Sequence, residues 1–112
     1  SLWIHGGFSE KDTMDVRQAF AFTLKRARKA KHLTQEDFDL ASSRTYLSSL
    51  ERAQKSPTLD KIDQLAKVLE VHPAALIAVS YSLKDGHKRS AGTLDVILQE
   101  ARILLKIVEG TL

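Results

Sequence analysis

Residues 44–52, RTYLSSLER, hold the side chains of this chain that are best suited to binding another molecule. Leu47 and Leu50 lie three residues apart, the spacing that places two side chains on one side of a helix. The other side would carry polar and cationic side chains, from Arg44, Thr45, Ser48, Ser49 and Arg52. Such groups donate hydrogen bonds to nucleobase edges and phosphate oxygens, and no acid joins them before Glu51. Binding of a nucleic acid is therefore the chemistry that we expect of this face.

The sequence contains no comparable set of residues for catalysis or for metal binding. The four histidines, His5, His32, His72 and His87, lie far apart and never at a paired-ligand spacing such as i, i+4. The absence of cysteine excludes disulfides and cysteine-ligated zinc. The serines near residues 43 and 48 have no neighbouring histidine to activate them, and no glycine-rich phosphate loop is present. We therefore predict neither an enzyme nor a protein with a metal or other cofactor.

Two short helices joined by a tight turn are expected to position the polar face. Thr34 is a helix N-cap candidate, and Asp37 stands three residues later, where a capping-box acid would reach back. A short helix is expected over 35–41. Serine prefers caps to helix interiors, so the two serines that follow should end this helix, and Ser43 should cap the next one, over 44–52.

At these residues the sequence resembles a known family. The ordered motifs TQED, YLSSLER and SPTLDKIDQLAKVLEV look like the helix-turn-helix of the phage repressor and Cro proteins, often called the Xre family. The resemblance covers residues 16–81 and implies an all-α fold with a five-helix, repressor-like DNA-binding domain over 15–81. It also implies double-stranded DNA as the partner, because the second helix of such a pair enters the major groove.

The resemblance assigns roles to residues on both sides of the turn. The second helix of the pair, the recognition helix, is expected to contact base edges through Arg44, Thr45 and Ser49, with Tyr46 and Ser48 at the margin. Phosphate contacts are expected from Gln35, Ser43, Arg52 and Lys55. In the family, the residue matching Arg28 pairs with the acid matching Glu51 and braces the first helix of the domain against the recognition helix. A structural ion pair is therefore expected here.

Several positions depart from the family pattern. The turn is two residues shorter than usual and lacks its glycine, and Ala53 replaces the glycine that usually follows the recognition helix. Asp39 stands one residue after the inward-facing Phe38, where the family has a small alanine, and burying its charge would be costly. The first helix of the pair is therefore expected to be rotated or shortened so that Asp39 faces water, which leaves Leu40 or Ala41 to pack.

Three further helices complete the expected domain. The first covers 15–31, and its basic last turns either face solvent or approach a phosphate backbone. Its apolar face is formed by Val16, Phe20, Leu24 and Ala27. Thr58 is an N-cap candidate for the next helix. The apolar face of that helix would be Leu59, Ile62, Leu65, Ala66 and Leu69. Pro73 suits the start of the last helix of the domain, over 74–81.

The C-terminal part is expected to form a linker and one long helix. Residues 82–92, SLKDGHKRSAG, are polar with two glycines, and Thr93 would cap a helix that ends at Gly110. One apolar stripe of this helix is formed by Leu94, Ile97, Leu98, Ala101, Leu104, Leu105 and Val108. A second, displaced stripe is formed by Val96, Ile103 and Ile107, so apolar side chains cover more than half of the helix.

This wide apolar arc predicts that the C-terminal element, residues 93–112, dimerises. A single small domain could cover one stripe and would leave the other exposed. A homodimer would also place two recognition helices about 34 Å apart, the spacing that reads a palindromic site. The alternative is that the helix folds back within one chain, where Phe22, Trp3 and Phe8 would cover the second stripe.

Length and composition fit one small globular protein. The 112 residues suffice for one domain and an appended element, and 43% apolar and 28% charged residues are ordinary values. The net charge of +3 favours an anionic partner only mildly. Without a long apolar run or a secretory signal, we expect a cytoplasmic protein with no membrane segment. Residues 1–14 form either an N-terminal arm or, if Met14 is the natural start, mostly an addition to the natural chain.

The leading hypothesis is a sequence-specific transcriptional regulator of bacterial or phage type, a repressor that binds a palindromic operator as a homodimer. A second hypothesis is the antitoxin of a toxin–antitoxin pair with the same DNA-binding fold. A third is a protein-interaction module that has kept the fold without binding DNA. The sequence does not identify the operator or any protein that regulates the chain.

Overall fold

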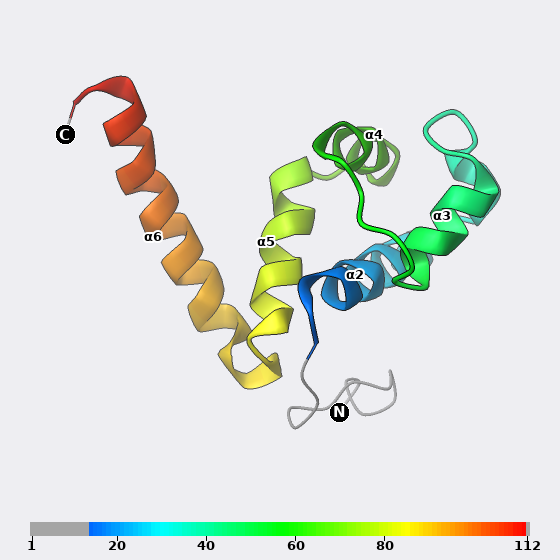
Figure 1. The fold of residues 1–112 in the computed structure, drawn as a ribbon, viewed down its shortest axis with the longest axis horizontal. Helices are drawn as coiled ribbons and strands as arrows, with labels where there is room; N and C mark the ends of the chain where they lie inside the picture. The colour runs from blue at the N-terminus through cyan, green and yellow to red at the C-terminus, as the bar shows by residue number, and fades with distance from the viewer. Residues whose placement is uncertain (1–13, 112) are drawn as a thin grey trace.

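The computed structural model describes residues 14–111, and every regular element in that range is helical, which confirms the predicted all-α fold (Figure 1). In chain order the elements are α2 (Val16–Ala30), η1 (Gln35–Phe38), α3 (Arg44–Glu51), α4 (Leu59–Leu69), α5 (Pro73–Lys84), η2 (His87–Arg89) and α6 (Ser90–Glu109), where η marks a 3₁₀-helix. The predictions for residues 1–13, including the covering role of Trp3 and Phe8, lie outside the described residues.

Side-chain caps start α2, α4 and α5. Asp15 and Gln18 form a capping box at α2, in which each side chain accepts a hydrogen bond from the other residue's backbone N–H, at 2.8 and 3.0 Å. At α4 the Thr58 hydroxyl accepts a single hydrogen bond from Lys61 N, at 3.1 Å. At α5, Pro73 takes the first helical position, and the ring of His72 accepts a backbone N–H. Each cap satisfies a donor that has no partner within its own helix.

One hydrophobic core joins the elements from α2 to α5. Its most completely buried apolar side chains come from α2, η1, α3 and α4, and are Leu24, Phe38, Leu47, Leu50, Leu65 and Leu69. The prediction that Leu59 belongs to this core is wrong, because Leu59 is 76% exposed. As the first residue of α4 it lies at the rim of the domain, where it borders an apolar hollow of about 220 Å³ together with Phe20 and Tyr81.

The first helix of the pair is shorter than the predicted 35–41. It is the four-residue η1, and it closes where the backbone N–H groups of Ala41 and Ser42 both donate to Phe38 O at 2.8 Å. Asp39 is exposed, as expected from the cost of burying its charge. Leu40 does not pack but is fully exposed, so Phe38 carries the packing of this segment, with Ala41 partly buried.

Helices replace most of the predicted linker over 82–92. α5 continues to Lys84, because Ser82 is satisfied inside the helix, where its hydroxyl donates to Ala78 O at 2.7 Å, and because Leu83 is buried. α6 begins at Ser90, and Thr93 is not its cap but donates through its hydroxyl to Asp85 Oδ2 at 3.0 Å. Most of these polar residues are therefore helical, and the predicted linker shrinks to Asp85 and Gly86.

The long helix α6 packs on α5 at its start and then diverges from the other helices, so that its last turns lie far from the domain (Figure 1). All residues from 98 to 111 are exposed in the single chain. The helix ends at Gly110, which adopts the left-handed conformation at φ 77°, as predicted. Within residues 14–111, neither α6 nor any other helix combines the length and apolar character needed to cross a membrane.

The end of α3 offers a test of how the missing glycine affects stability. Ala53 has φ 59°, and it closes the helix with its N–H donating to Leu50 O at 3.1 Å while Gln54 N donates to Ser49 O at 2.9 Å. Relief of left-handed strain outweighs the entropy that glycine adds to the unfolded chain, so we expect Ala53→Gly to raise the free energy of unfolding by about 0.5–1 kcal/mol.

Urea unfolding at a fixed protein concentration measures this change. Ala75→Gly is the matched control, because Ala75 is exposed within α5 and glycine there should cost about 0.5–1 kcal/mol. Equal destabilisation by both substitutions would contradict the strain at Ala53.

Candidate nucleic-acid interface

The recognition helix α3 is attached to the domain by its apolar side. Leu47 and Leu50 are buried in the core, and Ser43 caps the helix by accepting a hydrogen bond from Tyr46 N at 3.1 Å. The opposite side leaves Arg44 and Thr45 exposed and Tyr46 half-buried. The start of α3, where its backbone N–H groups and first side chains face outward, is therefore the part that another molecule can reach.

The structure contradicts the prediction that Ser49 contacts bases. Ser49 is 7% exposed, and its hydroxyl donates to Thr45 O at 3.0 Å. The loop after α3 folds back toward it, because Gln54 N donates to the Ser49 carbonyl. Ser48 stays half-buried on the same helix. The accessible part of the predicted base-reading set is thus Arg44 and Thr45, with Tyr46 and Ser48 partly accessible.

A buried ion pair fixes the far end of α3 against α2. Arg28 Nε lies 2.7 Å from Glu51 Oε2, and Arg28 Nη2 donates to Glu51 Oε1 at 3.0 Å, which is a bidentate arrangement. The two side chains are only 11% and 3% exposed. Hydrogen bonding to Glu51 raises the pKa of the Arg28 guanidinium above its ordinary value. Arg28 Nη1 also donates to Leu33 O at 3.0 Å, and Gln35 Nε2 donates to Glu51 Oε1 at 3.2 Å.

Two lysines gather around the ring of Tyr46 beside the start of α3. Lys55 Nζ and Lys61 Nζ each lie 5.4 Å from the ring centroid, a distance at which a cation is attracted to the aromatic face. Lys61 Nζ also donates to Ala41 O at 2.6 Å, which ties α4 to the turn before α3. Sequence reasoning predicted Lys55 but missed Lys61, because only the tertiary fold brings α4 to this turn.

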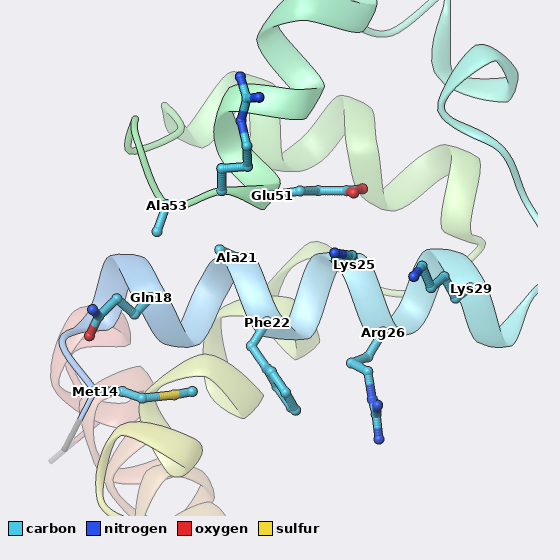
Figure 2. A pocket seen from close by; sticks show the side chains of 10 residues that line it. Met14, Gln18, Ala21, Phe22, Lys25, Arg26, Lys29, Glu51 and Ala53 are labelled. Atoms are coloured by element: carbon cyan, nitrogen blue, oxygen red, sulfur yellow. The ribbon is translucent and has the colours of Figure 1, made fainter. Parts of the chain in front are cut away.

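A second basic surface lies between α2 and the end of α3. It is a groove of about 440 Å³ whose cationic lining is Lys25, Arg26, Lys29 and Arg52. Figure 2 shows Lys25 and Lys29 on the edge of α2 next to α3, whereas Phe22 and Arg26 point away from α3. Arg26 lies over the Phe22 ring, 5.3 Å from its centroid. The groove thus extends the positive charge of the interface beyond the recognition helix.

One exposed ion pair crosses the turn. Arg44 Nη2 pairs with Glu36 Oε1 of η1, and the two side chains are 57% and 67% exposed. The predicted base-reading arginine therefore has an acidic partner in the DNA-free protein.

Elsewhere in residues 14–111, the histidine, aspartate and glutamate side chains form no group of three or more that could hold a metal ion.

Comparison with known proteins agrees with this geometry. Residues 24–76, which include η1 and α3, match the family described as Helix-turn-helix. Over 66 residues the chain is 39% identical to a protein of Sinorhizobium fredii, the uncharacterized HTH-type transcriptional regulator y4dJ, and the match covers 57% of this chain and 86% of that relative. No solved structure matches the chain significantly.

The ion pair gives a stability prediction. Glu51→Ala leaves the Arg28 guanidinium buried without its carboxylate, so we expect a loss of about 3–5 kcal/mol in the free energy of unfolding. The matched double variant Arg28→Met, Glu51→Leu removes both charges and should lose less. Thermal and urea unfolding measure both. If Glu51→Ala melts within about a degree of the parent, a shift that corresponds to a few tenths of a kcal/mol, the pair does not brace α3.

Proposed function

Because this chain belongs to the Xre-like helix-turn-helix family of DNA-binding transcriptional regulators, we propose that it is a repressor that binds a palindromic operator as a homodimer. The observation that carries the proposal is the exposed start of α3. Arg44 and Thr45 project from a helix whose other side is locked into the core, and helices presented in this way read bases in the major groove. Such a role places the protein on DNA in the cytoplasm.

Base reading is proposed to fall mainly on Arg44 and Thr45. The Arg44 guanidinium can donate two hydrogen bonds to the O6 and N7 atoms of one guanine, and Thr45 can contact a thymine methyl group or donate to an acceptor. Tyr46 and Ser48 contribute at the margin, because both are half-buried. A small reading set of this kind specifies only a few base pairs in each half-site.

Phosphate contacts are proposed to surround the reading helix. The Gln35 amide gives one N–H to Glu51 and keeps a second for a phosphate. The Ser43 hydroxyl accepts from the backbone and can still donate its hydrogen. Exposed Arg52 and Lys55 add charge, and Lys61 joins them beside Tyr46. Neutralised phosphates release counterions, so binding should weaken steeply as salt rises.

The homodimer is proposed from the uncovered surface of α6. Most of its large apolar side chains are exposed, by fractions between 38% and 76%, and these are Leu94, Val96, Leu98, Ile103, Leu104, Leu105, Ile107 and Val108. They come from both apolar stripes, and although Ile97 is partly buried, packing on α5 leaves most of each stripe exposed. Each partner in a stable complex typically buries roughly 800 Å², and these exposed side chains provide an apolar surface along α6 for such a contact. A second copy is favoured as the occupant, because two-fold symmetry also supplies the second recognition helix.

Arg44→Ala tests the base-reading role. We expect a loss of about 1–3 kcal/mol in operator binding for each half-site and a relaxed preference at one base pair. Lys55→Ala is the comparison, because loss of a phosphate contact should weaken all sequences alike and lower the salt slope by about one. Selection of binding sites from random DNA, followed by titration, measures both. An unchanged selected sequence for Arg44→Ala would contradict its assignment.

Leu98→Asp combined with Leu105→Asp tests the dimer. Two charges placed on the apolar stripe of α6 should yield a monomer by light scattering, with much weaker operator binding, because a single domain engages only one half-site. Gln99→Asp is the matched control, since it adds a charge to the polar face and should leave the dimer intact. Circular dichroism reports whether each variant keeps its helices. A parent that is monomeric at tens of micromolar, or a double variant that still dimerises, would exclude α6 as the interface.

A further inference from the structure

The exposed ion pair between Glu36 and Arg44 has a role that the proposed DNA binding alone does not include. We infer that Glu36 is a positioning residue that sets the selectivity of Arg44, by holding its guanidinium through one nitrogen and leaving further N–H donors for a guanine. The inference rests on the proposed function, since Arg44 must lie at the DNA for its partner to matter.

The short turn brings the two residues together. η1 ends at Phe38 and α3 begins at Arg44. This short separation leaves Glu36 of η1 beside Arg44, the first residue of α3. The neighbouring acid Asp37 is already engaged, because its carboxylate accepts from Thr34 N at 2.7 Å and from the Thr34 hydroxyl at 3.1 Å. Among the described residues, Glu36 is the acid that pairs with Arg44.

The geometry and the strength of the pair decide what Arg44 can bind while Glu36 holds it. The guanidinium has five N–H donors, and the contact with Glu36 runs through Nη2, so a guanine can accept from the remaining donors while the ion pair persists. A bidentate contact from arginine to guanine is among the strongest base-specific contacts, whereas exposed ion pairs are weak and are further weakened by salt. A phosphate or an unmatched base offers a smaller gain, and the Glu36 charge also repels the phosphate backbone.

Glu36 should consequently weaken non-specific binding more than operator binding. In the free protein it neutralises Arg44, which removes one cation from the general attraction to DNA. At the operator the pair does not have to break, because the guanidinium held by Glu36 still donates to the guanine. The ratio of operator affinity to non-specific affinity is then larger than it would be without Glu36. The complex with non-specific DNA has lost the free charge of Arg44, whereas the operator complex keeps the guanine contact.

Glu36→Gln tests this inference, measured by fluorescence anisotropy with the selected operator and with a scrambled duplex over a series of salt concentrations. Binding to the scrambled duplex should tighten about two- to fivefold for each subunit in contact, with a salt slope steeper by about one per subunit. Operator affinity should change by less than about twofold, so the specificity ratio falls.

Asp39→Asn is the matched control, because it removes an exposed negative charge from the same turn without removing the partner of Arg44. It should strengthen both duplexes alike and leave the specificity ratio unchanged. In the Arg44→Ala background, Glu36→Gln should no longer alter the ratio.

Equal strengthening of both duplexes by Glu36→Gln would overturn the inference and leave the proposed function standing, since the acid would then act only through its charge. A parent protein that binds operator and scrambled DNA equally would instead overturn the proposed function, and the inference with it.

Discussion

Removing the guanidinium of Arg28 and the carboxylate of Glu51 from water costs several kcal/mol, which only close and complete pairing offsets. The structure provides it through two hydrogen bonds of 2.7 and 3.0 Å between the side chains. A third bond from Arg28 reaches Leu33 O, and Gln35 donates to the same carboxylate. One polar cluster thereby connects α2, the loop before η1 and the end of α3. The direction in which α3 presents its outer face depends on this cluster, because eight residues of helix alone would be only marginally stable.

The start of α3 is held by different means. Here the turn is short and has no glycine, and it relies on the Ser43 cap and on Lys61, whose ammonium group donates to Ala41 O. Lys61 and Lys55 both lie over the ring of Tyr46. Residues that position the recognition helix therefore also place positive charge beside it. If α3 reads DNA as proposed, a helix fixed in this way would enter the groove without the rearrangement that would lower its affinity.

Local chemistry explains which features the sequence predicts. Caps such as Ser43 and Thr58, and the stop at Gly110, depend on side chains within four residues, so they can be read directly. The partner of Arg28 lies 23 residues away, and it was expected only from family resemblance. Ser49 was misjudged because its burial arises only when the loop after α3 folds back toward it. Lys61 was missed because it reaches the turn only when α4 packs beside it. For Ser82 the bond from its hydroxyl to Ala78 O is local, and what the sequence did not reveal is the burial of Ser82 and Leu83, which arises only in the folded domain.

The small size of the reading face bears on the assembly. With Ser49 buried, one subunit offers Arg44, Thr45 and two half-buried side chains, and so few contacts distinguish only a few base pairs. Free energies from two half-sites add when both recognition helices belong to one rigid dimer, so a modest preference in each subunit multiplies in the complex. In the proposed homodimer, the exposed apolar surface of α6 would hold two such domains together. The short recognition helix and the long exposed helix would then be complementary features, since the first would gain specificity from a second copy and the second would bind it.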